Sequence, residues 1–192
     1  MANESSTGFG LRPLRKVGQT DNNAGLGEYS VASNAAAIYH QELVQMQGTG
    51  YILSAGAGGP YLLGSLNGAF YTDPTTSKPT WSTYAPSVAA SDHTCLINDN
   101  PQTMFEAMTL RTDYTNPGSV GANADIVVGT GSTTTPFSSQ NSLGAVAPVA
   151  AATQIKILGL TRDTLSQDVA VAGSVWRCMI NEHLLGNNSI GI

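Results

Sequence analysis

The strongest constraint on the fold of this chain is a series of short apolar runs separated by turn-forming residues. From residue 28 onward, such runs alternate with clusters of Gly, Pro, Asn, Asp, Ser and Thr. This pattern is typical of short β-strands joined by turns, and the longer apolar repeat of an extended helix is missing. The sequence therefore predicts an all-β domain with long loops, a small barrel or sandwich of jelly-roll-like or tulip-like form.

The expected strands follow from these runs. Residues 43–46 and 51–53 flank Gly48-Thr49-Gly50 and predict a hairpin. Residues 61–63 and 69–71 flank Asn67-Gly68, a dipeptide typical of a tight turn. Residues 33–46 have a second interpretation, in which Ser33 caps a short helix. Further strands are expected at 29–32, 95–97, 104–108, 126–128, 154–160 and 175–180, and long loops at 72–91 and 112–152.

Charge is scarce in this chain. Only 11% of the residues are charged and the net charge is −5, whereas about 25% are charged in an ordinary soluble domain. A negative chain with few cations argues against a nucleic-acid binder, and its low charge argues against an anionic membrane partner. Residues 1–8 lack the features of a secretion signal, so Cys95 and Cys178 are expected as reduced, buried thiols.

Residues 1–27 differ from the rest of the chain, and we expect them to form an extended N-terminal arm ahead of a β domain at residues 28–192. The arm is rich in glycine and has no periodic apolar pattern. One interpretation is a frayed terminus, and the other is an arm that becomes ordered on a partner. In the second case the apolar anchors are Phe9, Leu11 and Leu14, and the charged contacts are Arg12, Arg15 and Lys16.

The sequence has no recognisable catalytic constellation. Phosphate-binding, nucleophile-elbow and zinc-site spacings are absent, and we expect no enzyme activity, metal or cofactor. His93 and Cys95 would share a face of a strand, as a thiol–imidazole pair requires. We favour the simpler interpretation, in which Cys95 packs in the core. His183 is expected to be solvated.

Several segments resemble a group of virion proteins. Residues 8–15, Gly-Phe-Gly-Leu-Arg-Pro-Leu-Arg, resemble the "G-F-G-L/F-R-P-[LV]-R" opening of tailed-bacteriophage head decoration (cement) proteins, and residues 28–31 resemble the strand that follows it. Residues 98–106 are similar to their "D-[DN]-P-x-x-x-[FY]-E" segment. Residues 157–160 and 175–185 are similar to their closing strands and "I-N-x-H-x-[LF]" ending. Their "G-D-P-V" between early strands is absent, and residues 72–91 and 112–152 match no part of the pattern.

The resemblance implies a structural protein of the virion. Such a protein is made in the host cytoplasm, binds the outer surface of an icosahedral capsid and clamps neighbouring major capsid protein subunits. It implies a homo-oligomer, with a trimer favoured and a dimer as the alternative. The contacts would be made by the arm residues, adding along an exposed sheet edge of the capsid.

Three other functions are compatible with the residues. The first is a glycan-binding or host-attachment module, in which Tyr71, Trp81 and Tyr84 in a Thr- and Ser-rich loop stack on sugars. The second is a hydrolase built around His93 and Cys95. The third is a major capsid subunit, which the lack of a long helical pattern disfavours.

Overall fold

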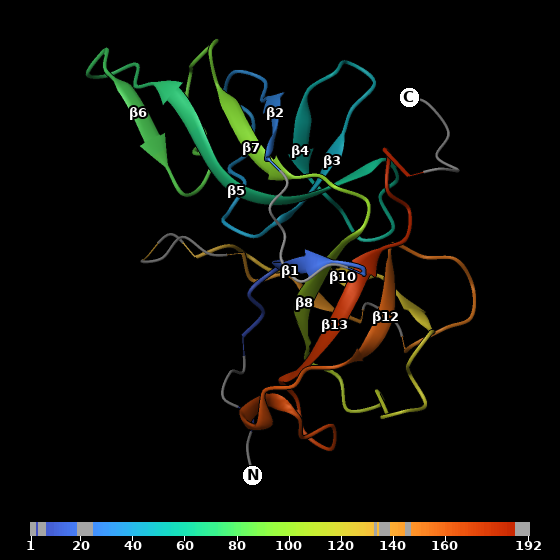
Figure 1. The fold of residues 1–192 in the computed structure, drawn as a ribbon. Coiled ribbons are helices and arrows are strands. Elements are labelled where there is room, and N and C mark those ends of the chain that lie inside the picture. Colours follow the sequence, from blue (N-terminus) through green and yellow to red (C-terminus); the bar gives the residue numbers. More distant parts are fainter. Residues whose placement is uncertain are drawn as a thin grey trace.

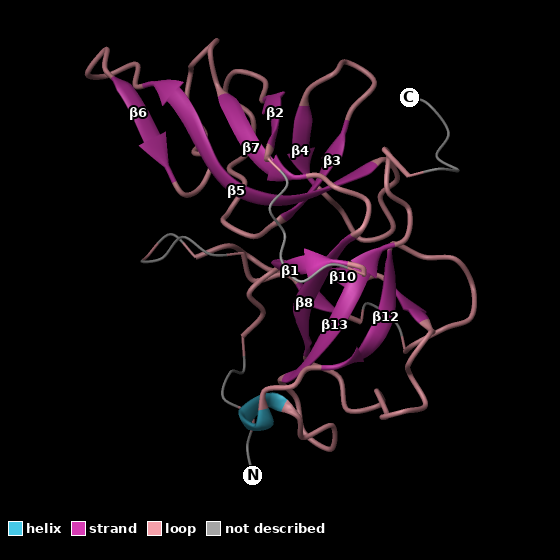
Figure 2. Ribbon diagram, viewed as in Figure 1, coloured by secondary structure: helices cyan, strands magenta, loops and turns pink. Residues whose placement is uncertain are grey.

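The computed structural model describes residue 3 and residues 7–18, 25–132, 134, 139–144 and 147–186 (Figure 1). Residues 1–2, 4–6 and 19–24 of the expected arm lie outside this described part. Within it, every regular element is a strand except for one 3-10 turn, and no helix is long and apolar enough to cross a membrane (Figure 2). The elements are β1 Arg12–Lys16, β2 Gly27–Ser30, β3 Leu43–Met46, β4 Ile52–Ser54, β5 Leu62–Thr72, β6 Pro79–Ser82, β7 Thr94–Asn98, β8 Thr103–Thr109, β9 Asn123–Ala124, β10 Ile126–Val127, β11 Ser142–Leu143, β12 Ile155–Leu160, η1 Thr164–Ser166 and β13 Ser174–Ile180.

The strands form two sheets, and the expected all-β barrel or sandwich is confirmed. One sheet has the order β10-β11-β8-β13-β12-β9, with β1 also paired to β8. Its two ends, β9 and β10, are consecutive in the chain and are separated only by Asp125, so this sheet is nearly closed into a barrel. We call this part, residues 7–16 and 103–186, the barrel lobe.

The second sheet has the order β2-β7-β5-β3-β4, with β6 also paired to β5. A parallel bridge between Val31 and Ile52 brings the ends of β2 and β4 together. We call residues 27–98 the inserted lobe, because the chain leaves the barrel lobe after β1 and returns to it at β8. The segment that leaves the barrel lobe and the segment that returns to it are joined by a hydrogen bond, in which the Val17 amide donates to the Gln102 carbonyl at 2.8 Å.

Each lobe has a hydrophobic core, although the sequence predicted one β domain from residue 28 onward. Trp176, Phe105 and Ile157 lie in the barrel core, and Ile97, Leu66 and Cys95 lie in the inserted-lobe core. Three inserted-lobe residues, Leu43, Ala55 and Leu62, belong to the barrel core, so the two cores are joined through β3, β5 and the residue that follows β4.

The expected hairpin of residues 43–46 and 51–53 is confirmed as β3 and β4, and no helix forms over residues 33–46. The expected turn at Asn67-Gly68 is wrong, because β5 runs unbroken from Leu62 to Thr72. The dipeptide lies at an irregularity in the β5–β7 register, between Leu66 and Gly68. A bulge uses the same small, turn-favouring residues as a hairpin does, so the local pattern fits both.

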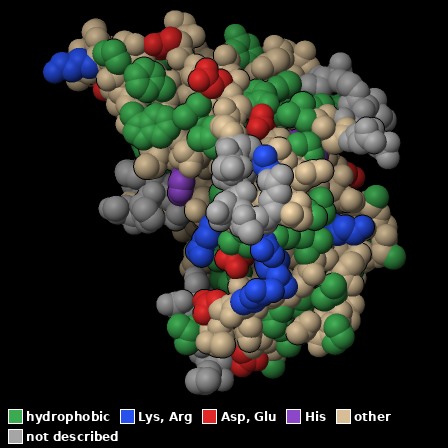
Figure 3. Space-filling model, in the orientation of Figure 1, with side chains coloured by type: hydrophobic (Ala, Val, Ile, Leu, Met, Phe, Trp, Pro, Cys, Tyr) green, Lys and Arg blue, Asp and Glu red, His purple; other side chains and the backbone are tan. Residues whose placement is uncertain are grey.

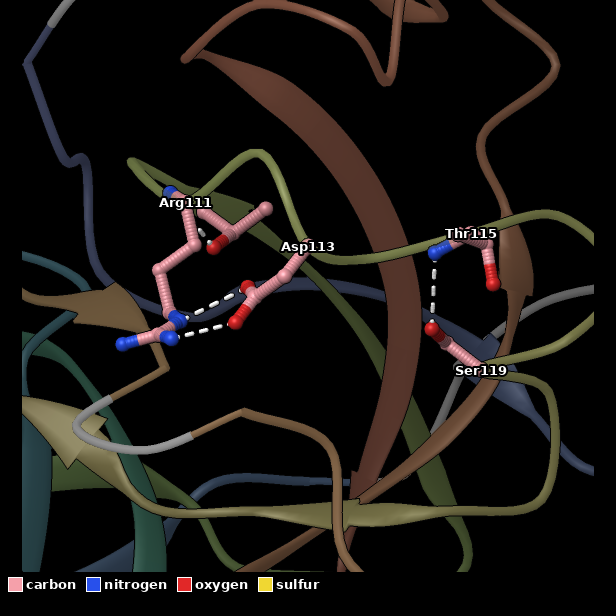
Figure 4. A network of polar contacts seen from close by, with 5 residues as sticks. Arg111, Asp113, Thr115 and Ser119 are labelled. Atoms are coloured by element: carbon pink, nitrogen blue, oxygen red, sulfur yellow. Dashed lines mark hydrogen bonds and ion pairs between the residues drawn. The ribbon is translucent and has the colours of Figure 1, made fainter.

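The predicted long loop at residues 72–91 contains strand β6, which pairs with β5. The loop that follows β8 is held by local polar contacts (Figure 4). The Arg111 guanidinium donates to both carboxylate oxygens of Asp113, and the Thr115 amide donates to Ser119 Oγ at 2.8 Å. The positive charge of Arg111 is therefore neutralised within its own loop.

Residues 8–16, part of the arm expected over residues 1–27, pack on their own chain, and residues 12–16 form a strand of its sheet. β1 pairs with β8, and the Gly10 and Leu11 amides donate to the Asn141 and Gln41 carbonyls at 3.0 and 2.8 Å. Gly10 has a φ of 81°, and a Cβ there would lie 2.1 Å from the Gln41 oxygen. The close approach of two backbones therefore requires glycine at this position.

Candidate functional site

A groove of about 350 Å³ crosses the outer face of the barrel lobe. It lies over β1, β8 and β13 and beside the turn that follows β12. Its lining is Leu14, Arg15, Met104, Glu106, Thr161, Arg162, Asp163 and Arg177. Three segments that are far apart in the sequence therefore build one site.

Strand alternation explains which side chains face the groove. On β8, Phe105 and Ala107 point into the barrel core, so Met104 and Glu106 lie on the opposite face. Glu106 is in register with Arg12 of β1 on one side and Arg177 of β13 on the other. A row of alternating charge, Arg–Glu–Arg, therefore crosses three neighbouring strands.

A bulge in β1 adds a further side chain, that of Arg15, to this face. Pro13 pairs with Phe105 and Arg15 pairs with Met104, so Leu14 is the extra residue between two paired positions. In a regular ladder Arg15 would oppose Thr103 and point to the other face. The bulge instead places Arg15 beside Leu14 on the groove side, as bulges commonly redirect side chains.

Glu106 is held by its neighbours rather than left to bind a ligand. Thr161 Oγ1 donates to its Oε1 at 2.8 Å, and the Arg12 guanidinium lies 3.8 Å from its Oε2. Arg12 also lies over the Phe9 ring, 4.6 Å from the centroid. Arg12 and Phe9, both expected as partner contacts, therefore already interact within the chain.

Arg177 is positioned by the bulged strand β12. Its Nε donates to the Leu160 carbonyl at 3.1 Å. A Cβ on Gly159, whose φ is 155°, would lie 3.0 Å from an Arg177 terminal nitrogen. The missing side chain leaves room for the guanidinium against β12, and the hydrogen bond fixes its direction toward the groove.

Two arginines of the groove differ from Arg111. No acidic side chain among the described residues lies within ion-pair distance of Arg15 or Arg162, whereas Arg111 is paired with Asp113. Asp163, the acid next to Arg162, accepts a hydrogen bond from the Leu165 amide at 3.1 Å and caps η1. In the groove, the guanidinium groups of Arg15 and Arg162 thus have no carboxylate partner among the described residues. The guanidinium group of Arg177 is held by the Leu160 carbonyl.

The electrostatics of the two lobes differ. Five of the eight Lys and Arg residues lie on β1, on β13 and in the turn after β12, namely Arg12, Arg15, Lys16, Arg162 and Arg177. Figure 3 shows blue side chains gathered over this part of the barrel lobe, with red ones between them. Residues 27–98 contain four acids and only Lys78 as a base. A chain of net charge −5 therefore carries a local excess of positive charge.

Two of the six expected arm contacts, Leu14 and Arg15, line the groove. Leu11 cannot be a partner contact, because it is 1% exposed and belongs to the barrel core. Lys16 is half-buried on β1, opposite Thr103. Sequence reasoning missed Glu106, Arg162 and Arg177. A signal was present for Arg177, since a single charge inside the apolar run of β13 indicates an outward-facing position.

The three aromatic residues expected as loop contacts lie in different surroundings. Tyr71 is 9% exposed and packs on His93, with ring centroids 5.2 Å apart. Tyr84 stacks on Tyr39 at 6.0 Å. Trp81 is exposed and lies opposite Phe70, which is equally exposed and which the sequence did not single out. The Trp81 indole lies over Gly68, where a Cβ would come within 2.4 Å of the ring.

The residues of the disfavoured thiol–imidazole interpretation are buried. Cys95 and Cys178 are buried free thiols, as expected, and burial raises the pKa of Cys95 to about 12. Burial lowers the pKa of His93, which is 2% exposed. Among the described residues, no group of three or more His, Cys, Asp or Glu side chains is placed to hold a metal ion.

Comparison of this chain with protein family models, with curated proteins and with solved structures finds no match.

Proposed function

We propose that this protein is a structural component of a virion that binds the outer surface of a tailed-phage capsid and clamps neighbouring major capsid protein subunits. One observation carries the proposal. Four of the five segments that resemble head decoration proteins, residues 8–15, 98–106, 157–160 and 175–185, contribute β1, β8, β13 and β12, which are neighbours in one sheet. The fifth, residues 28–31, lies at β2 of the inserted lobe. Segments that resemble one family and lie side by side in one sheet could contribute to a common binding surface.

The groove face of the barrel lobe is the surface that meets the capsid in this proposal. It brings arginines that have no carboxylate partner among the described residues next to Leu14, an apolar side chain that is 37% exposed. A homo-oligomer, with a trimer favoured, would present several such faces at once and gain avidity without new contacts. Binding to the assembled shell and not to free subunits would stabilise the shell by mass action.

Co-sedimentation with purified phage heads tests this function. We expect saturable binding to expanded heads and little binding to unexpanded shells, with an unrelated acidic protein of similar size as the control. Deleting residues 1–16 is an unsuitable test, because β1 and Leu11 belong to the barrel lobe. Equal, unsaturable recovery of this protein and the control with both kinds of shell would contradict the proposal.

A glycan-binding or host-attachment role is the second candidate, and the exposed Trp81–Phe70 pair favours it. In the register of the inserted lobe, Trp81, Phe70, Thr94 and Ser30 form one row across β6, β5, β7 and β2. Exposed rings beside hydroxyl groups suit sugar stacking and hydrogen bonding. A glycan array probed with the wild type and with Trp81→Ala tests this role, which the absence of any Trp81-dependent signal would contradict.

A further inference from the structure

We propose that the groove of the barrel lobe binds an extended acidic segment of the protein partner, with carboxylates on Arg15, Arg162 and Arg177 and an apolar side chain against Leu14 and Met104. This inference rests on the proposed function, because it names the chemistry by which the capsid would be recognised. It replaces the expected contact by a free arm, since the groove combines residues from both ends of the chain.

The three arginines supply the donors. Guanidinium groups match carboxylates geometrically and form two parallel hydrogen bonds, which makes them the usual partners of carboxylates at interfaces. Arg15 and Arg162 are exposed and have no acidic partner among the described residues. Arg177 keeps its Nε on the Leu160 carbonyl, which orients its remaining nitrogens. Because the Arg177 side chain is already oriented before a partner binds, it loses less conformational entropy on binding.

The apolar part of the lining selects a peptide over a bare anion. Leu14 lies in the β1 bulge and is 37% exposed, and Met104 is paired with Arg15, the next residue. A flexible methionine adapts to side chains of different shape. A segment in which acidic residues alternate with an apolar one would satisfy both parts of the groove.

The acids of the site disfavour nucleic acid as the occupant. Glu106 and Asp163 belong to the lining, and the inserted lobe has an excess of acids. A continuous phosphate backbone would approach these carboxylates, whereas a peptide can place its few carboxylates on the arginines alone. Nucleic-acid binding also depends on releasing many counterions, which needs more cations than this groove presents.

The first test compares two charge reversals in head binding. Arg162→Glu changes the groove, and Lys78→Glu makes the same charge change at an exposed position of the inserted lobe. We expect Arg162→Glu to weaken binding about tenfold or more, and Lys78→Glu to change it less than about twofold. Both positions are exposed, so unchanged circular dichroism and urea midpoints are expected for both variants.

The second test measures the groove without capsids. Isothermal titration uses a short peptide of alternating Asp and Leu, its Asn–Leu analogue and a single-stranded DNA of similar length. We expect the acidic peptide alone to bind, with an affinity that falls with added salt and with Arg162→Glu but not with Lys78→Glu.

The outcomes separate the two proposals. Head binding that is unaffected by Arg162→Glu, together with no peptide binding, overturns the inference and leaves the capsid function standing. Peptide binding that depends on Arg162, with no head binding by the wild type, supports the groove chemistry and overturns the capsid function. Tighter binding of DNA than of the acidic peptide overturns the inference in favour of a nucleic-acid site.

Discussion

The two lobes are built from similar short strands, but their strands come from different places in the chain. The inserted lobe uses the continuous stretch from residue 27 to 98, whereas the barrel lobe combines residues 7–16 with residues 103–186. The positive charge gathers on the discontinuous lobe, where β1 and β13 both flank β8. A site assembled from both ends of a chain exists only when the fold is complete, whereas the exposed Trp81–Phe70 pair needs one local strand pair.

The sharpest test of this difference is whether the N-terminal segment supports the barrel lobe. Leu11 is fully buried in the barrel core, and Leu14, three residues later, is exposed in the groove. We expect Leu11→Ala to lower the free energy of unfolding by about 3 kcal/mol, because a buried leucine is lost and a cavity remains. Leu14→Ala should lower it by less than about 0.5 kcal/mol. Urea unfolding followed by circular dichroism measures both.

Equal and small effects of the two substitutions would show that residues 8–16 do not pack on the barrel lobe in solution. The expected free arm would then be restored, and the groove would lose Leu14 and Arg15. A large effect of Leu11→Ala combined with unchanged head binding of Leu14→Ala would keep the fold but remove Leu14 from the binding surface.

In both lobes, the sequence predicted individual strands better than the pairing between strands that are far apart in the chain. The β3–β4 hairpin and the strands around residues 95–97, 104–108, 154–160 and 175–180 follow from local alternation. The pairing of β1 with β8 does not, because the chain that separates them is a lobe with its own core. At Asn67-Gly68 the sequence predicted a turn that does not form. The dipeptide favours a turn locally, but the pairing of β5 with β3, β6 and β7 keeps the strand continuous.

The candidate site was predicted only in part for the same reason: two of its eight lining residues, Leu14 and Arg15, were singled out in the sequence. Leu14 and Arg15 stand in a short basic segment that is visible in the sequence, but Arg162 and Arg177 reach the groove only through the β12–β13 pair. The bulge that turns Arg15 outward depends on its register with β8. His183, expected to be solvated, is 4% exposed, because the residue after it bonds to β5, where the Leu184 amide donates to the Leu62 carbonyl at 2.7 Å.

The next largest effect is expected at the junction between the lobes. Gln154 is fully buried; its Oε1 accepts from the Ile126 amide at 3.1 Å, and its Nε2 donates to the Gly56 and Gly59 carbonyls at 2.8 and 3.1 Å. It therefore links the closure of the barrel to a turn of the inserted lobe.

We expect Gln154→Leu to lower the free energy of unfolding by about 2 kcal/mol, because buried backbone groups lose their partners. The two tryptophans report the lobes separately, since Trp176 lies in the barrel core and Trp81 in the inserted lobe. Replacing one tryptophan by phenylalanine leaves the other as the only fluorescent tryptophan. With Gln154 present, the unfolding transitions of Trp81→Phe and of Trp176→Phe should each have a single step. In the Gln154→Leu background the two midpoints should separate, and a barrel lobe that unfolds unchanged would remove Gln154 as the link.

The smallest predicted effect is a loss of stability that appears only at acidic pH, and it concerns His183. Its Nδ1 accepts from the Leu185 amide at 3.1 Å, and burial lowers its pKa to about 4, although the Asp99 charge acts in the opposite direction. In the unfolded chain a histidine has a pKa of about 6.5. Above that pH both states are neutral, and as the pH falls from 6.5 toward 4 only the unfolded state gains the proton. The free energy of unfolding therefore falls over this range, by about 3 kcal/mol at most.

Replacing His183 by Asn keeps an acceptor for the Leu185 amide and removes the titration. We expect the wild type to lose stability relative to His183→Asn as the pH falls from 6.5 to 4.5. Urea midpoints of the two proteins measure this change. Other groups titrate in both proteins, so the difference isolates this side chain. The pKa of His93 is also lowered by burial, so part of the acid sensitivity should remain in the variant and decrease further when His93 is replaced as well. Parallel stability curves for the wild type and His183→Asn would mean that His183 is solvated, and that the barrel lobe does not close against β5 at this point.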